Sequence, residues 1–136
     1  MAQGDRIRVV LIDDDELTRS VLRFALDIDR YEVVGEAASG RSGLETCLRL
    51  KPEIIFLDVA MPEVDGLTIL PSLRDAFPAA EVLMVTASND RQTIERAIMG
   101  GATGYLVKPL TAGKIEDALR RPAANILRKR SGQVAV

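Results

Sequence analysis

The segment IIFLDVAMPEVDG, residues 54–66, is a run of large apolar residues that stops at an aspartate and a Met-Pro turn. Its consecutive apolar side chains predict a strand that is buried on both faces, as in a parallel sheet. A negative charge at the end of such a strand has two explanations. Asp58 either caps the loop that follows, or the rigid strand holds it where a charge is used.

Strand-like and helix-like patterns alternate on both sides of this segment. Short apolar runs predict four further strands, at residues 8–12, 31–38, 81–86 and 104–108. Helical spacing predicts a helix after each strand, with these buried faces: Leu17, Val21, Phe24, Ala25 and Ile28; Leu44, Cys47 and Leu48; Leu67, Leu70 and Leu73; Ile94, Ala97 and Ile98; Ile115, Ala118 and Leu119. The alternation predicts an α/β fold, a doubly wound parallel sheet of five strands in the order 2-1-3-4-5 with five helices.

Polar residues and prolines mark the ends of the predicted helices. Pro71 is expected to kink the third helix, and Pro122 to end or bend the fifth, because proline removes a backbone donor. The residues in N-cap positions are Asp15, Asn89 or Asp90, and Thr111.

A basic cluster follows the predicted fifth helix, and its members are Arg120, Arg121, Arg128, Lys129 and Arg130. The whole chain has a net charge of −2, whereas nucleic-acid binders usually carry a basic excess. We therefore interpret the cluster as a solvated end or linker stub and expect no direct nucleic-acid binding. The chain divides into a domain at residues 1–121 and a basic C-terminal tail at residues 122–136.

Composition narrows the chemistry that is open to the chain. Of the 136 residues 47% are hydrophobic and 28% are charged, which is typical of a globular domain. The chain has no histidine, which excludes Ser-His-Asp and Cys-His catalysis and phosphohistidine formation on this chain. Cys47 is the single cysteine and is predicted to be a small core residue. No apolar run predicts a membrane helix or signal peptide, so we expect a cytoplasmic location.

Polar residues stand at the ends of four predicted strands, and they are Asp13 and Asp14, Asp58, Thr86 and Lys108. Parallel α/β sheets bind ligands at this edge, and neighbouring strands are about 4.8 Å apart. The three carboxylates would therefore crowd together and repel, unless a cation such as Mg²⁺ neutralised them. A hydroxyl and an ammonium group nearby suit the stabilisation of a phosphoryl group in transfer to Asp58.

From about Ile7 to about Leu119 the sequence resembles a response-regulator receiver domain of two-component signalling, in the CheY-like superfamily. The matching pieces, in order at the strand ends, are LIDDDE, DVAMPEVDG, VTAS and GYLVKP. The resemblance implies a flavodoxin-like fold and makes residues 1–121 the receiver domain. It also implies a signalling domain, which catalyses only its own phosphorylation and dephosphorylation.

The resemblance assigns roles to individual residues. Asp58 would be the phosphoacceptor, with Asp13, Asp14 and the backbone carbonyl of Ala60 as further Mg²⁺ ligands. Thr86 and Lys108 would contact the phosphoryl group, and Tyr105 would follow Thr86 as a switch residue. The Lys108–Pro109 peptide is expected to be cis.

The implied partners are a sensor histidine kinase or histidine phosphotransfer protein as donor, and a downstream output domain or protein. The surface of the fourth helix and fifth strand would respond to phosphorylation, and a phosphorylation-dependent homodimer is one candidate output.

Two alternatives stay open from the sequence. A Mg²⁺-dependent phosphohydrolase with an aspartyl phosphate would need an acid/base two residues after its nucleophile, where Asp58 has Ala60. Asp13 and Asp15 have that spacing, but the chain leaves no room for a cap domain. The other alternative is an interaction module that carries no phosphate, although such receivers usually lose a site residue and this chain has them all.

Overall fold

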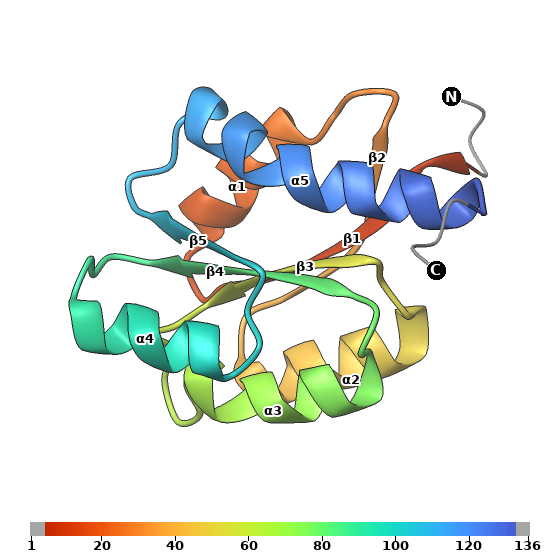
Figure 1. Cartoon of the computed structure of the whole chain (residues 1–136). Helices are drawn as coiled ribbons and strands as arrows, with labels where there is room; N and C mark the ends of the chain where they lie inside the picture. The colour runs from red at the N-terminus through yellow and green to blue at the C-terminus, as the bar shows by residue number, and fades with distance from the viewer. Residues whose placement is uncertain (1–4, 133–136) are drawn as a thin grey trace.

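The computed structural model describes residues 5–132 and shows a five-stranded parallel sheet between two layers of helices (Figure 1). The strands are β1 (Ile7–Ile12), β2 (Tyr31–Ala37), β3 (Ile54–Asp58), β4 (Glu81–Thr86) and β5 (Gly104–Val107). The helices are α1 (Glu16–Ala25), α2 (Gly40–Leu50), α3 (Gly66–Ala76), α4 (Arg91–Met99) and α5 (Ala112–Arg130).

The strand order is β2-β1-β3-β4-β5, which confirms the predicted topology. β3 is the central strand, and every residue from Ile54 to Asp58 is buried, as its apolar run predicts. The register pairs Ile12 of β1 with Leu57, and Asp58 with Val85 of β4. The ends of β1, β3 and β4 therefore meet at one edge of the sheet.

Helices α1 and α5 cover one face of the sheet, and α2, α3 and α4 cover the other (Figure 1). The core accordingly forms two clusters, one on each face. Phe56 belongs to the α1–α5 side, while Leu57 and the buried Cys47 belong to the other side. Since neighbouring strand residues point to opposite faces, one strand supplies both clusters. Among the described residues, no helix combines the length and the apolar character that a membrane crossing needs.

The predicted N-caps are confirmed in the structure. Asp15, Asp90 and Thr111 each accept a hydrogen bond from a backbone N–H in the first turn of α1, α4 and α5. Asp65 caps α3 in the same way. Pro71 lies inside α3 at an exposed position, and the helix continues past it to Ala76.

The predicted buried face of α1 is correct for Val21 and Ala25, which pack against the core, and wrong for its other members. The helix buries Thr18 and Leu22, whereas Leu17 is 71% exposed and Phe24 is 86% exposed. Phe24 stands two residues after Leu22 and therefore points to the other side of the helix. Ile28, which follows α1, is also exposed. The apolar stripe read from the sequence thus includes a surface that the sheet does not cover.

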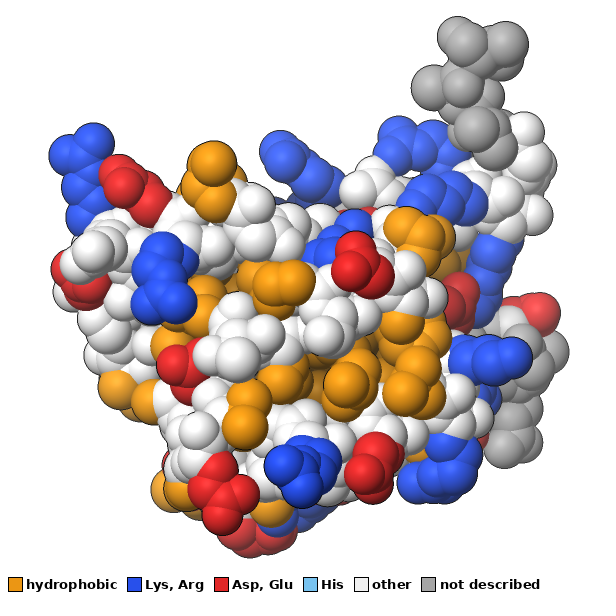
Figure 2. Space-filling model, turned by 90° about the horizontal axis from the view of Figure 1, so that it is seen from below, with side chains coloured by type: hydrophobic (Ala, Val, Ile, Leu, Met, Phe, Trp, Pro, Cys, Tyr) orange, Lys and Arg blue, Asp and Glu red, His pale blue; other side chains and the backbone are white. Residues whose placement is uncertain are grey.

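Helices α2 and α4 also expose residues that were predicted to be buried, namely Leu48 and Ile98, and α4 exposes Met99 as well. Figure 2 views the layer of α2, α3 and α4, and its hydrophobic side chains lie among Lys, Arg, Asp and Glu. The helical pattern was correct for Cys47 and Ala97, which are fully buried.

The predicted boundary before Pro122 is also wrong, because α5 continues through this proline to Arg130. Ala123 and Ile126 are buried in the core, and the contacts they make offset the backbone hydrogen bond that Pro122 cannot donate. The Arg130 guanidinium also bonds to a Glu53 carboxylate oxygen at 2.7 Å. Residues 122–130 are therefore part of the domain and not a tail, while residues 133–136 lie outside the described residues.

Candidate functional site

Asp58 is held at the end of β3 by the loop that follows it. The Val59 N–H donates to the carbonyl of Val85 at 2.9 Å, and the Gly66 N–H donates to the carbonyl of Val59 at 2.8 Å. This second bond brings the start of α3 back onto the strand end. A Cβ atom at Gly66 would lie 2.1 Å from the carbonyl oxygen of Asp58, so the close approach requires glycine.

Three carboxylates meet at this edge, as predicted. Carboxylate oxygens of Asp13, Asp14 and Asp58 all lie within 4.8 Å of one another. Asp13 and Asp58 are each 2% exposed, whereas Asp14 is exposed to solvent. Two hydrogen bonds fix Asp13. Its N–H donates to the carbonyl of Ala37 at 3.0 Å, and its Oδ1 accepts from the Asp15 N–H at 2.8 Å.

Lys108 reaches two of these carboxylates from the end of β5. Its Nζ lies 3.2 Å from Oδ2 of Asp13 and 3.5 Å from Oδ2 of Asp58. The Lys108 N–H donates to the carbonyl of Thr86, and the Lys108–Pro109 peptide is cis as expected. The Lys108 ammonium donates to Oδ1 of Asp13 at 3.5 Å, whereas Oδ2 is buried and none of the described residues is aligned to donate a hydrogen bond to it.

The cluster carries more negative than positive charge, and the pKa values reflect this. Burial, and then the charge of Asp13, raise the pKa of Asp58 to about 7 against the opposing effect of Lys108. For Lys108, burial lowers the pKa, but the carboxylates of Asp13 and Asp58 outweigh it and the pKa is raised. A hard divalent cation with oxygen ligands suits such a set, and the donor-free Oδ2 of Asp13 is an available ligand atom.

Thr86 and Tyr105 meet at the loop between β4 and α4. The buried Thr86 hydroxyl accepts a hydrogen bond from the Ser88 N–H at 3.1 Å. The Tyr105 hydroxyl donates to the carbonyl of the same residue at 2.9 Å. Ser88 therefore links the two predicted switch residues, and no pattern in the sequence indicates this link. Ala60 is exposed, two residues beyond Asp58.

Asp15 has a different task from its two neighbours. It caps α1, where its carboxylate accepts hydrogen bonds from the Leu17 N–H and, at 2.7 Å, from the Thr18 hydroxyl. The Thr18 hydrogen bond is the main cause of its lowered pKa. The Asp15 carboxylate is thus engaged in capping α1, which argues against a role as the acid/base of the phosphohydrolase alternative.

Arg19 is a site neighbour that the sequence reasoning missed. Its guanidinium donates to the backbone carbonyl of Asp13 at 2.6 Å. A cation near the N-terminus of a helix is disfavoured by the helix dipole, and this misplaced charge is the signal that could have drawn attention to it.

The family model described as "Response regulator receiver domain" matches residues 9–120. The chain belongs to this family. It is a receiver domain of two-component response regulators, and accepting a phosphoryl group is the role of the family.

Curated relatives agree with this assignment. The receiver domain is 37% identical over 120 residues to a probable C4-dicarboxylate response regulator DctR of Halalkalibacterium halodurans, covering 88% of this chain and 52% of that protein. The chain thus spans about half the length of that relative. It is 32% identical to the chemotaxis protein CheY of Thermotoga maritima, covering 84% of this chain and 95% of that protein.

Solved receiver domains share the fold. The REC domain of AraT from Geobacillus stearothermophilus has a TM-score of 0.85 at 26% identity, covering 91% of this receiver domain and 98% of that chain. The CheX-CheY-BeF3-Mg²⁺ complex from Borrelia burgdorferi has a TM-score of 0.80 at 25% identity, covering 85% of this chain and 87% of that chain.

Proposed function

We propose that Asp58 accepts the phosphoryl group in a Mg²⁺-dependent reaction with a phosphohistidine of a partner histidine kinase or phosphotransfer protein. The observation that carries the proposal is the placement of the buried Asp58 carboxylate beside Asp13, within 3.5 Å of the Lys108 ammonium. In this proposal the donor must be a partner, because the chain has no histidine.

The residues present fit a Mg²⁺ ion. Asp13, Asp14 and Asp58 would hold it, together with the backbone carbonyl of Ala60, and all of these are hard oxygen donors. When bound, the ion would neutralise the carboxylates and the phosphoryl oxygens. The similar CheX-CheY complex from Borrelia burgdorferi includes Mg²⁺, which supports this part of the proposal.

In the proposed transfer, Asp58 is the nucleophile and Lys108 neutralises charge. A carboxylate oxygen of Asp58 attacks phosphorus, an O–P bond forms, and the P–N bond to the donor histidine breaks with its electron pair left on nitrogen. The Lys108 ammonium would stabilise the negative charge that develops on the phosphoryl oxygens, since it already lies beside the Asp58 carboxylate. The rigid β3 strand supports Asp58, so the reaction depends mostly on positioning and charge neutralisation. The domain would thus catalyse its own phosphorylation and dephosphorylation.

Phosphorylation is proposed to act through Ser88. A Thr86 hydroxyl that turned to a phosphoryl oxygen would release the Ser88 N–H, and Tyr105 holds the carbonyl of that same residue. The α4–β5 surface would then change its conformation. Ile98 and Met99 are the large exposed apolar residues of α4 and would form part of the contact with an output domain, an output protein or a second copy. The cytoplasmic location stays a prediction.

A labelling experiment tests the acceptor. Wild-type protein incubated with Mg²⁺ and a small acyl phosphate should gain the mass of one phosphoryl group, and Asp58→Asn should not, because the amide is not a nucleophile. Asp75→Asn changes an exposed aspartate on α3 and serves as the matched control that labels normally. Equal labelling of Asp58→Asn and wild type would show that Asp58 is not the phosphoacceptor.

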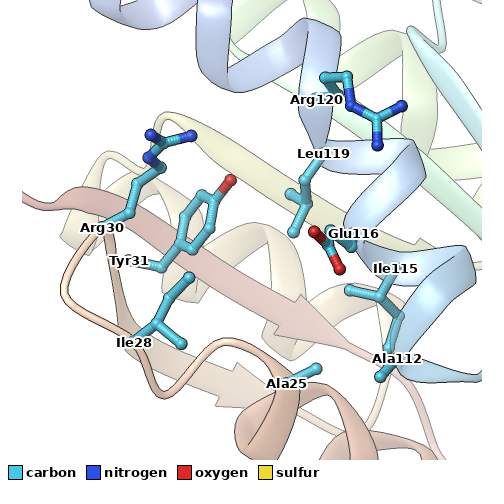
Figure 3. A pocket seen from close by; sticks show the side chains of 9 residues that line it. All are labelled: Ala25, Ile28, Arg30, Tyr31, Ala112, Ile115, Glu116, Leu119 and Arg120. Carbon is cyan, nitrogen blue, oxygen red and sulfur yellow. The ribbon is translucent and has the colours of Figure 1, made fainter.

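The α1–α5 face offers a docking place for the donor protein. A hollow of about 410 Å³ lies there, between Ile28 and Tyr31 on one side and Ile115 and Leu119 of α5 on the other, with Arg30 and Arg120 at its rim (Figure 3). The exposed Leu17 and Phe24 extend this apolar face along α1, and Leu17 stands four residues after Asp13. A partner seated on α1 would therefore also be near the acidic cluster.

Phe24→Ala should separate docking from chemistry. Removing a large exposed aromatic from a contact face is expected to slow phosphotransfer from a donor protein that labels wild type by about tenfold or more. Labelling by the small acyl phosphate should be unchanged, because Phe24 is 86% exposed and supports no site residue. Leu48→Ala on α2, on the opposite side of the sheet, is the control. Equal transfer rates for both variants would place the donor elsewhere.

A further inference from the structure

Two arginines and two glutamates form a network beside the acidic cluster. Both arginines of α1, Arg19 and Arg23, contact both glutamates, Glu16 at the start of the helix and Glu36 near the end of β2. The Arg19 Nε lies 3.1 Å from Glu36, and an Arg23 terminal nitrogen lies 3.1 Å from Glu16. The network therefore holds the start of α1 against β2.

Arg19 makes one contact with the acidic cluster that Arg23 does not make. Its terminal nitrogen NH1 donates to the backbone carbonyl of Asp13 at 2.6 Å, and its side chain is only 13% exposed. Arg23 is 39% exposed, and it donates to the Ser20 hydroxyl at 2.8 Å in addition to its two glutamates. The carbonyl that Arg19 binds belongs to the peptide that joins Asp13 to Asp14.

We infer that Arg19 is a positioning residue, which fixes the Asp13–Asp14 peptide and with it two carboxylates of the proposed cation site. The Asp13 N–H is already bonded to Ala37, so Arg19 restrains the second peptide of the same residue. Glu36 fixes the planar guanidinium by binding a different nitrogen, so one rigid group spans both contacts. This inference rests on the proposed function, because it concerns the affinity of the same site.

Replacing Arg19 has two opposite expected effects on Mg²⁺ affinity, one from the lost positive charge and one from the lost hydrogen bond to the Asp13 carbonyl. An arginine near the acidic cluster repels a cation, so removing its charge would by itself tighten Mg²⁺ binding. Loss of the Asp13 carbonyl bond would instead let the Asp13–Asp14 peptide rotate and would weaken binding. Groups that orient metal ligands from outside typically change metal affinity about 10- to 100-fold when they are removed, so position should outweigh charge.

Calorimetric titration with Mg²⁺ alone, at fixed pH and ionic strength, tests the inference. We expect the dissociation constant of Arg19→Gln to be about tenfold or more higher than that of wild type. Arg23→Gln removes a charge from the same network but leaves the Asp13 carbonyl bond, and it should bind as tightly as wild type or more tightly. Arg19→Lys keeps the charge but lacks the planar guanidinium that bonds to Glu36 and to the Asp13 carbonyl at the same time. Its Mg²⁺ affinity should therefore lie between those of Arg19→Gln and wild type.

The outcomes separate this inference from the proposed function. Wild type that binds no Mg²⁺ would contradict the cation site itself. If wild type binds and Asp13→Asn abolishes binding, the site stands, and Arg19→Gln binding as tightly as Arg23→Gln would overturn the role of Arg19. Thermal melts show whether each variant is folded. Should Arg19→Gln fail to fold, Arg19→Lys decides, because wild-type affinity in that variant also overturns the inference.

Discussion

Replacing Asp58 with asparagine is expected to raise the melting temperature of the metal-free protein at pH 8 by on the order of 5–10 °C. The wild-type carboxylate is ionised at this pH in a buried place beside Asp13, and Lys108 offsets only part of the cost. The amide has nearly the same shape and carries no charge. The substitution that removes the proposed acceptor should therefore stabilise the fold.

The pH dependence follows from the direction of the pKa shift. The pKa of Asp58 is about 7 in the folded protein, above the ordinary value of 3.8, so the folded state holds this proton more tightly than the unfolded state. The resulting stability is fully present below pH 4 and is lost as the pH rises through 7. At about 1.4 kcal/mol per pKa unit, the loss by pH 8 has an upper limit of about 4 kcal/mol.

Melting curves in EDTA at pH 5 and pH 8 check this prediction. At pH 5 the Asp58 carboxyl is mostly protonated in the folded protein but already ionised in the unfolded chain, so Asp58→Asn should raise the melting temperature by less than half as much as at pH 8. Excess Mg²⁺ at pH 8 should stabilise wild type more than the variant, because binding favours the folded state and the variant lacks one ligand charge. A stabilisation of equal size at both pH values would contradict a raised pKa at Asp58.

Replacing Gly66 with alanine is expected to destabilise the protein by about 1–3 kcal/mol and to slow labelling of Asp58 by acyl phosphate. The added Cβ would lie 2.1 Å from the carbonyl oxygen of Asp58, and 3.1 Å from the Leu57 side chain. Backbone cannot rotate away as a flexible side chain can. The start of α3 must therefore move off the end of β3, and the loop that carries Ala60 must move with it.

Gly113→Ala is the matched control for this substitution. Gly113 also lies in the first turn of a helix, α5, but a Cβ atom there would meet nothing within 4 Å. Alanine should stabilise that helix by about 0.5–1 kcal/mol, since glycine loses more backbone freedom on folding. Chemical denaturation measures both variants, and equal stability of Gly66→Ala and wild type would show that α3 can shift at no cost.

The strand order and the acidic edge could be predicted because they depend on local patterns. The buried run before Asp58 and the strand-end positions of Asp13, Thr86 and Lys108 are visible in the sequence, and a parallel sheet necessarily gathers strand ends at one edge. The caps of α1 and α5, Asp15 and Thr111, were predictable for the same reason, because capping is a contact within a few residues.

Helix faces and helix ends were less predictable. On α1 the apolar residues extend around more than one side, and the sequence does not say which side the sheet will cover; the structure buries Leu22 and exposes Phe24. At Pro122 the local rule predicted an end or a bend, but Ala123 and Ile126 pack into the core, and that burial favours continuing the helix to Arg130. In both cases packing against distant strands decides between local options.

The sequence by itself determined the α/β fold, the family and the residues at the strand ends, because apolar period and motif order are properties of the chain. Only the tertiary structure decided how those residues are held. The glycine contact at Gly66, the Ser88 link between Thr86 and Tyr105, and the Arg19 bond to Asp13 each depend on how a helix or loop sits against the sheet. Such contacts join separate elements over a few ångströms, and no spacing along the chain encodes them.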